Sequence, residues 1–277
     1  MKALSILIPN RFTWDAIILT IESIKKRTIY PDYKIIVSDN SMSPLCRGVE
    51  PEPENKLQDN GSRIEYLREQ AKTGRIQLIE NHDQERKYGH GENIKKLLSA
   101  CNTEYALLFV STAEVLDPHW LHVLTWLIQT DKDLGVARFK SGGKQRELNW
   151  IAPVYWPNIM LLNMLLYRKF QAPDDWDLRR ILKSEWKYGH IFNQFPPLRE
   201  PENGKERVFL DTGSRLWERL TFENPAGYRI LPLPDAYWKK HIVLYDGIDR
   251  NSHRPDHPWV RDRLRAANER LSLLRRQ

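Results

Sequence analysis

The chain has little cysteine, no long apolar segment and no repeated or low-complexity tract. Cys46 and Cys101 are its only cysteines among 277 residues, too few for a disulfide framework and without metal-type spacing, so we expect both to be free thiols. No window approaches the roughly 18 to 20 apolar residues of a membrane span. The first residues lack the apolar core and cleavage site of a signal peptide. These absences predict a cytoplasmic protein.

Basic residues outnumber acidic ones, and the excess lies near the C-terminus. Lys and Arg total 43 against 36 Asp and Glu, which gives a formal net charge of +7. From Arg250 onward there are eight arginines and three acidic residues. Such a charge favours a polyanionic partner, namely a phosphate-bearing substrate, an anionic membrane surface or nucleic acid, or it serves only solubility.

Strand-like and helix-like patterns alternate over the first 131 residues. Four short apolar runs are typical of buried strands: residues 4–9, 33–39, 76–79 and the run from Tyr105. Helical periodicity lies between them over residues 14–26 and 92–100. This alternation predicts an α/β protein with a doubly wound, mostly parallel sheet.

An insertion over residues 41–74 interrupts that alternation. It carries three prolines and a mixed-charge run, and it is longer than a crossover needs. We expect a surface loop that leads into a short helix over residues 63–70. A lid over a substrate is the alternative.

Beyond residue 131 the pattern changes. Strands are expected over residues 134–139 and 228–233, and helices over residues 157–170, 175–186 and 259–274, with a strand leading into a helix over 209–224. The last helix is amphipathic and rich in arginine. It either docks on the protein surface, which we favour, or lies on a membrane.

Four segments occur in a characteristic order along the first 120 residues. Leu4–Asn10 is an apolar run ending in Pro-Asn, and Ile35–Ser41 is one ending in Asp-Asn-Ser. Gly89–Asn93 is a glycine-rich opening of a helix, and Leu107–Trp120 is a strand followed by Asp-Pro. In this order they resemble the nucleotide-sugar-binding half of inverting GT-A glycosyltransferases, specifically glycosyltransferase family 2.

The resemblance implies a GT-A (Rossmann-like) fold and a division of the chain. Residues 1–131 correspond to the nucleotide-sugar-binding half, 132–248 to the acceptor-binding and catalytic half, and 249–277 to a basic, helical C-terminal segment. The implied reaction moves a sugar, with inversion, from a nucleotide-diphosphate sugar to a hydroxyl of a glycan, a lipid-linked glycan or another polymer. A location in the cytoplasm, or peripheral at the inner face of the membrane, fits this activity.

The resemblance also implies a donor site at the ends of these segments. Asp39 matches the acid that contacts the nucleoside in the family, and its alternative role is to stabilise a turn. The two glycines allow close approach of a ligand or form a plain turn, and Asn93 contacts the nucleotide or caps its helix. The residues expected to bind the nucleotide sugar are Pro9, Asn10, Asp39, Gly89, Gly91, Asn93, Ser111, Thr112 and Ala113.

Acids are missing where the family has Asp-x-Asp. Ser111, Thr112 and Ala113 occupy those positions, and hydroxyls replace carboxylates poorly as ligands of Mn²⁺ or Mg²⁺. Glu114 either supplies a carboxylate to such a metal or faces solvent, and we favour the second. We therefore expect a weak metal requirement or none.

Basic side chains after the last predicted strand offer another way to balance the charge of a diphosphate. By the resemblance, Lys240, His241 and Arg250 are expected near the phosphates, and His241 is also a candidate metal ligand with Glu114. The alternative for His241 is a place in a solvated basic segment.

The segment Phe209–Glu218 resembles the family segment in which an acid just before a helix acts as general base. Asp211 occupies that place, and its alternative role is to cap the helix. We expect Glu218 to be structural. Two other functions stay open: transfer of a sugar to modified bases in DNA, and a catalytically degenerate domain that acts as a scaffold.

Overall fold

The computed structural model describes most of the chain in thirteen segments. They are residues 3–10, 16–40, 62–81, 90–131, 134–139, 159–172, 174–177, 179–188, 207–210, 213–224, 227–233, 239–245 and 258–277.

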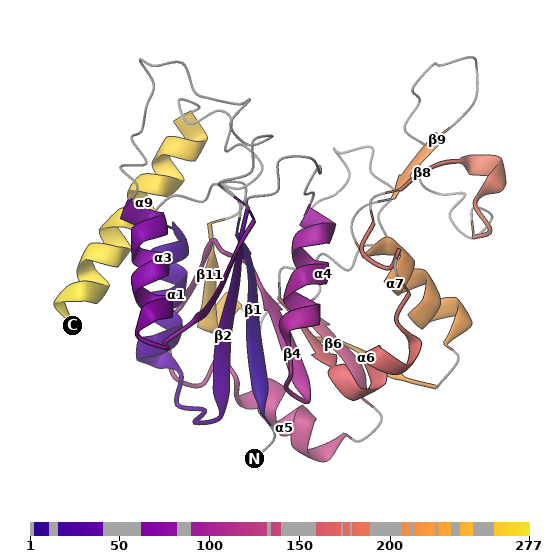
Figure 1. The fold of residues 1–277 in the computed structure, drawn as a ribbon, viewed down its shortest axis with the longest axis horizontal. Coiled ribbons are helices and arrows are strands. Elements are labelled where there is room, and N and C mark those ends of the chain that lie inside the picture. Colours follow the sequence, from indigo (N-terminus) through magenta and orange to yellow (C-terminus); the bar gives the residue numbers. More distant parts are fainter. Residues whose placement is uncertain are drawn as a thin grey trace.

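A seven-stranded sheet forms the centre of the described structure (Figure 1). Its strands are β1 (Leu4–Asn10), β2 (Tyr33–Asp39), β3 (Gln77–Glu80), β4 (Tyr105–Phe109), β6 (Leu134–Phe139), β7 (Ile159–Asn163) and β10 (Arg229–Leu233). Their order is β10-β6-β7-β4-β1-β2-β3, and β7 runs antiparallel to both of its neighbours while the other pairings are parallel. The predicted doubly wound, mostly parallel sheet is confirmed.

Helices cover both faces of this sheet. One face carries α1 (Ala16–Arg27), α3 (Ser62–Lys72), α5 (His122–Thr130) and α9 (Pro258–Arg276), and the other carries α4 (His90–Ala100), α6 (Met164–Phe170) and α7 (Ser214–Glu218). Successive side chains of a strand point to opposite faces, so Ile6 joins the first apolar core and Leu7 joins the second. Covering on both sides explains why all of β1 is buried and why its sequence is apolar without alternation.

Strands from both sides of residue 131 build this single sheet. β7 lies between β4 and β6, so the boundary expected at residue 131 does not separate two sheets. The other strands within the described residues form two small antiparallel ribbons: β5 (Ala113–Val115) with β11 (Ile242–Leu244), and β8 (Arg179–Leu182) with β9 (Arg207–Leu210).

Of two helix predictions in the second half, one was correct only in part and the other was wrong. Residues 159–163 form β7, and the helix expected over 157–170 begins only at Met164. All five residues of β7 are buried, and a short apolar run does not distinguish a buried strand from a buried helix. The segment expected as a helix over 175–186 contains β8, because Arg179–Leu182 pairs with a strand distant in sequence.

The C-terminal helix α9 packs beside α1 (Figure 1). It buries one apolar side, formed by Leu264, Ala267, Leu271 and Leu274. Within the described segments, no helix combines the length and apolar character needed to cross a membrane. The helix predicted over 63–70 is α3. Residues 41–61 of the insertion over 41–74, expected as a surface loop with a lid as the alternative, lie outside the described residues.

Candidate functional site

Polar side chains gather where β1 and β2 end at the carboxyl edge of the sheet. Asn10 and Asp39 are the last residues of these strands, are paired in register and are both fully buried. The Asn10 Nδ2 donates to Asp39 Oδ1 at 2.6 Å. In open α/β sheets this edge is where ligands bind, so the structure brings two predicted donor-site residues together there. Pro9, the preceding residue of β1, lies beside Ser38 in the register.

Asn93 joins helix α4 to the same edge. Its Nδ2 donates to the carbonyl oxygens of Asn10 at 3.3 Å and Ser38 at 3.1 Å. It is the fourth residue of α4, so the alternative that it caps the helix is wrong. The amide instead fixes the position of α4 against the ends of two strands.

Asn81, which is not among the predicted site residues, extends this buried network to the third strand. Its Nδ2 donates to Ser38 Oγ at 2.9 Å and to the Asn40 Oδ1, and its Oδ1 accepts from Lys96 Nζ. A signal was present, because Asn81 follows β3 as Asn40 follows β2. The edge therefore carries a connected set of amides, a carboxylate and an ammonium group.

Residues 111–113 replace Asp-x-Asp, and the first two of them form a turn, which we call the hydroxyl turn. Neighbouring segments hold this turn firmly. Ser111 and Thr112 are buried between β4 and β5. The Thr20 hydroxyl of α1 donates to the Ser111 carbonyl at 3.0 Å and accepts from the Ala113 N–H at 3.1 Å. The Tyr245 N–H donates to the Thr112 carbonyl at 2.8 Å. The turn thus carries two hydroxyls and no carboxylate, on a backbone fixed from two sides.

Glu114 is buried and bound to arginines, so the expectation that it faces solvent was wrong. Only 1% of its side chain is exposed. Its carboxylate accepts from Arg27 Nη1 at 3.3 Å, from Arg270 Nη2 at 2.7 Å and from Tyr245 Oη at 3.1 Å. The bond to Glu114 raises the pKa of Arg270, and burial together with the charge of Glu114 raises the pKa of Tyr245. Arg270 lies 156 residues from Glu114 in the sequence, so no local sequence pattern predicted this contact.

His241 lies at the far end of the β5–β11 ribbon from the hydroxyl turn. β11 runs antiparallel to β5, so Tyr245 is next to Thr112 whereas the His241 carbonyl accepts from the Leu116 N–H. The His241 Nδ1 lies 2.6 Å from Asp117 Oδ2. Burial raises the pKa of Asp117, but hydrogen bonds from His241 and from the backbone outweigh it and hold this pKa below its usual value. The structure therefore does not bring His241 to Ser111 and Thr112.

Of the other two basic candidates for phosphate binding, one is exposed and one lies outside the described residues. Lys240 is exposed just before β11. Arg250, like Gly89, lies outside the described residues. Among the residues that are described, no group of three or more His, Cys, Asp or Glu side chains is placed to hold a metal ion. Glu114, the first acid after residues 111–113 in the sequence, is already bound to guanidinium groups, so the described residues there do not fit a divalent cation.

Gly91 is required by packing inside the protein. A Cβ at this position would lie 2.0 Å from the carbonyl oxygen of Trp176. Gly91 is in the first turn of α4, and Trp176 belongs to the second apolar core. We expected Gly91 to allow close approach of a ligand or to form a plain turn. In the structure, the group that approaches it closely is the backbone carbonyl of Trp176.

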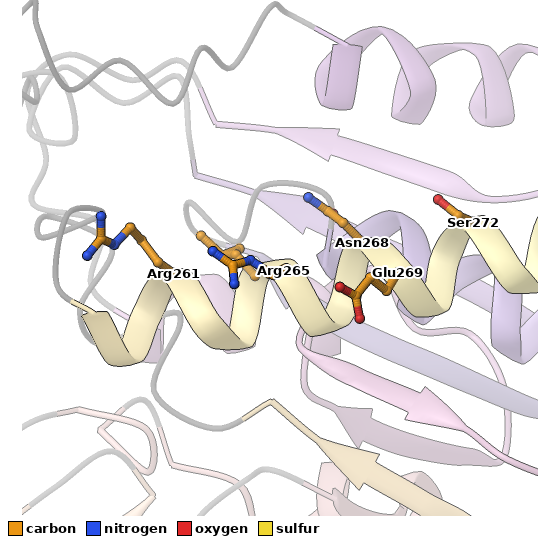
Figure 2. A pocket seen from close by; sticks show the side chains of 6 residues that line it. Arg261, Arg265, Asn268, Glu269 and Ser272 are labelled. Atoms are coloured by element: carbon orange, nitrogen blue, oxygen red, sulfur yellow. The ribbon is translucent and has the colours of Figure 1, made fainter.

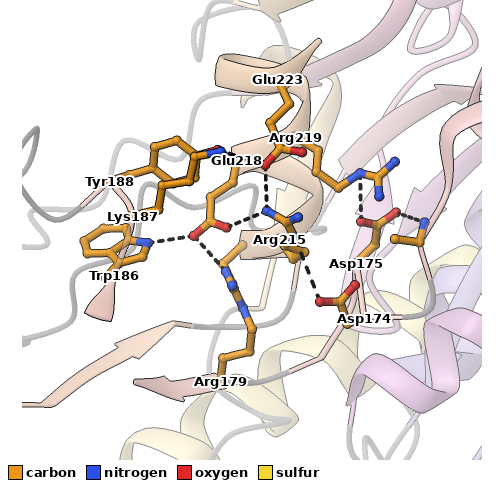
Figure 3. A network of polar contacts seen from close by, with 12 residues as sticks. Asp174, Asp175, Arg179, Trp186, Lys187, Tyr188, Arg215, Glu218, Arg219 and Glu223 are labelled. Atoms are coloured by element: carbon orange, nitrogen blue, oxygen red, sulfur yellow. Dashed lines mark hydrogen bonds and ion pairs between the residues drawn. The ribbon is translucent and has the colours of Figure 1, made fainter. Parts of the chain in front are cut away.

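Asp211 lies outside the described residues, but the helix that follows it is anchored by a buried acid. Figure 3 shows Glu218 of α7 between Arg179, Trp186 and Arg215. Arg179 Nη2 and Trp186 Nε1 each donate to Glu218 Oε1 at 2.8 Å. Only 2% of the Glu218 side chain is exposed, which agrees with the structural role expected for it.

Asp175 is a second buried acid beside α7. Its Oδ2 accepts from the Ala172 N–H at 2.8 Å, and its Oδ1 lies 3.6 Å from Arg219 Nε (Figure 3). Burial raises the pKa of Asp175 to about 6, although the backbone hydrogen bond and Arg219 oppose the shift. No sequence motif pointed to Asp175, because its burial depends on packing against distant segments.

Comparison with known proteins yields likenesses in structure only. No protein-family model matches the sequence, and no curated protein matches it. Among solved structures, the mannosyltransferase PcManGT from Pyrobaculum calidifontis, in complex with GDP-Man and Mn²⁺, matches with a TM-score of 0.50 and 14% identity over 84% of this chain. The match covers 55% of that protein, so this chain spans about half its length.

Two further structures are similar over shorter parts of the chain. S. aureus TarS 1-349 in complex with UDP-GlcNAc matches with a TM-score of 0.41 and 12% identity, over 66% of this chain and 50% of that one. Glucosyl-3-phosphoglycerate synthase from Mycobacterium tuberculosis, in complex with Mg²⁺ and UDP, matches with a TM-score of 0.40 and 16% identity, over 60% and 57%. The chain has the GT-A fold.

Proposed function

We propose that this protein is a glycosyltransferase that moves a sugar from a nucleotide-diphosphate sugar to a hydroxyl of a glycan, a lipid-linked glycan or another polymer, with inversion. The observation that carries the proposal is the buried Asn10–Asp39 pair at the carboxyl edge of a GT-A sheet. The mannosyltransferase with this fold was solved with a nucleotide sugar, GDP-Man. A carboxylate held by an amide at this edge is a suitable acceptor for the N–H groups of a base or the hydroxyls of a ribose.

The donor would lie along this edge, with its diphosphate toward Ser111 and Thr112. The hydroxyls of the turn can donate to phosphate oxygens, and Thr20 and Tyr245 hold the backbone of the turn in place. A turn that is fixed before the reaction need not reorganise when charge develops on the leaving diphosphate. Lys240 and Arg250 remain proposed phosphate contacts. His241 is not among them, because it lies at the other end of the β5–β11 ribbon and its ring is engaged by Asp117.

Inversion requires a single displacement at the anomeric carbon. The acceptor oxygen forms its bond to this carbon from the face opposite the diphosphate, the bond from the carbon to the diphosphate oxygen breaks, and the nucleotide diphosphate leaves. A carboxylate on the acceptor side takes the proton of the attacking hydroxyl. Asp211, three residues before the first residue of α7, is our candidate for this base.

A screen of nucleotide sugars tests the proposal directly. Uridine, guanosine, cytidine and thymidine diphosphate sugars are tested by thermal shift and by donor hydrolysis, and at least one is expected to bind. Asp211→Asn is expected to lower turnover by about 10² to 10⁴ while leaving donor binding intact. The exposed Asp262 of α9 supplies the matched control, Asp262→Asn. No binding of any donor would refute the proposal, and a folded Asp211→Asn protein with full cellular activity would favour a scaffold.

Arginines on the C-terminal helix α9 form a surface where an anionic partner could bind. A groove of about 430 Å³ runs along α9 and is lined by Arg261, Leu264, Arg265, Asn268, Glu269 and Ser272 (Figure 2). The apolar side of α9 is buried against the protein, so contact with anionic lipid or with DNA would be electrostatic and not by insertion. Binding to anionic vesicles or duplex DNA that weakens with salt, and weakens further in Arg261→Ala, would support such a partner.

A further inference from the structure

The acid that follows the hydroxyl turn is occupied by the protein itself. Glu114 stands in β5, one residue after Ala113, and both of its oxygens have partners. Oε1 accepts from Arg27 at 3.3 Å and from Arg270 Nη2 at 2.7 Å. Oε2 accepts from Arg270 Nε at 3.0 Å and from Tyr245 at 3.1 Å.

These partners come from three separate parts of the chain. Arg27 ends α1, Arg270 belongs to α9, and Tyr245 follows β11. Their donors meet on a side chain that is 1% exposed. Charge-assisted and bidentate bonds of this kind are the strong ones in proteins. Glu114 therefore joins α1, α9 and the β5–β11 ribbon at one buried point.

Such an acid is a poor ligand for a divalent cation. A cation would have to displace the guanidinium groups from the carboxylate oxygens and would then lie beside two positive charges, which repel it. The three preceding positions, where the resemblance implies metal-binding acids, carry only hydroxyls and a methyl group. His241, the other candidate ligand, is engaged by Asp117 beyond the opposite end of the ribbon.

We infer that Glu114 anchors the C-terminal helix instead of holding a metal ion, and that the chain binds its nucleotide diphosphate without a divalent cation at residues 111–114. The inference rests on the proposed function. Charge on the leaving diphosphate is then balanced by hydrogen-bond donors and by cationic side chains of the protein. The hydroxyls of Ser111 and Thr112 are the groups that this turn offers.

Calorimetric titration of the full chain tests the inference. Uridine, guanosine, cytidine and thymidine diphosphates are titrated in excess EDTA and, after removal of EDTA, in Mn²⁺. For the diphosphate that binds, the Kd is expected to agree between the two conditions within about threefold. In parallel, the electron paramagnetic resonance signal of Mn²⁺ without nucleotide should be unchanged when the protein is added.

The outcomes separate the inference from the proposed function. A Kd that tightens by about tenfold or more in Mn²⁺, or a protein-bound Mn²⁺ signal, overturns the inference and leaves the proposed function standing. Absence of binding for all four diphosphates in both conditions overturns both.

Glu114→Gln adds a check on the residue itself, with folding verified by circular dichroism. The ratio of the Kd values with and without Mn²⁺ should equal that of the unmodified protein and that of Arg276→Ala, an exposed arginine at the end of α9. A ratio that changes only in Glu114→Gln would identify Glu114 as a metal ligand and refute the inference.

Discussion

Removal of the Arg270 side chain should destabilise the protein because it breaks the contact between α9 and Glu114. Arg270→Ala deletes donors that lie 2.7 to 3.2 Å from a carboxylate that is 1% exposed. Breaking a buried ion pair from one side costs about 3 to 5 kcal/mol. The Arg270 side chain is 43% exposed, and Arg27 and Tyr245 stay on the carboxylate, so we expect about 2 kcal/mol.

This free energy converts to a measurable change in melting temperature. An unfolding entropy of about 2.1 cal/mol/K per residue gives about 0.6 kcal/mol/K for the whole chain, so the midpoint should fall by about 3 to 4 °C. Urea unfolding followed by tryptophan fluorescence gives the free energy itself, since the chain has 10 tryptophans. A double-mutant cycle with Glu114→Gln should return a coupling of about 1.5 to 2 kcal/mol.

Arg265→Ala is the matched control, because this arginine is exposed on the same helix. It should change the free energy of unfolding by less than about 0.5 kcal/mol. If Arg270→Ala costs no more than this control, or if the cycle shows no coupling with Glu114, then Glu114 does not anchor α9 and the reasoning fails.

Three further substitutions test other parts of the structure. Gly91→Ala should destabilise by about 1 to 3 kcal/mol or more, because its Cβ would lie 2.0 Å from the Trp176 carbonyl oxygen, and urea unfolding measures the loss. Asp175 binds its proton more tightly when folded, with a pKa of about 6 against 3.8, so stability should fall by up to about 3 kcal/mol as pH rises from about 4 to about 6, and Asp175→Asn should flatten that profile. Asp39→Asn should weaken binding of the nucleotide diphosphate by about 10- to 100-fold, measured by calorimetry, because a hydrogen bond to a charged group contributes about 1.5 to 3 kcal/mol.

Each of these three has a contrary result, and Gly91→Ala also has a matched control. Ser99→Ala, on the exposed side of α4, should be nearly neutral, and a Gly91→Ala protein equally stable would contradict the described packing. A pH profile of stability that is identical with and without Asp175→Asn would show that this carboxyl does not titrate as described. Unchanged nucleotide affinity in a folded Asp39→Asn protein would remove Asp39 from the donor site.

The first half of the fold followed from sequence because its signals are local. β1 and β2 are short apolar runs covered on both faces, and α1 between them repeats isoleucines at helical spacing. β7 and β8 were missed because their identity depends on partners far along the chain. β7 is a strand by virtue of its place between β4 and β6, and β8 by its pairing with β9.

The candidate site shows the same division. Asp39 and Asn10 were predicted from their place at the ends of strands, and parallel strands bring such ends to one edge. Glu114 was misjudged because its partners Arg270 and Tyr245 lie more than a hundred residues away. His241 was expected near the phosphates, but β11 runs antiparallel to β5 and puts it at the opposite end of the ribbon from Ser111 and Thr112.

The order of short motifs in the sequence was sufficient to predict the sheet and the edge where Asp39 lies. By aligning residues 111–113 with Asp-x-Asp, it also showed that acids are missing there. Those features depend on residue type and on spacing within one strand or helix. Only the tertiary structure decided what Glu114, His241, Gly91 and Asn93 do, because each contacts segments distant in sequence. A glutamate that binds a metal and a glutamate that binds an arginine look identical in a sequence. Their roles differ because the fold brings different groups within about 3 Å of the carboxylate.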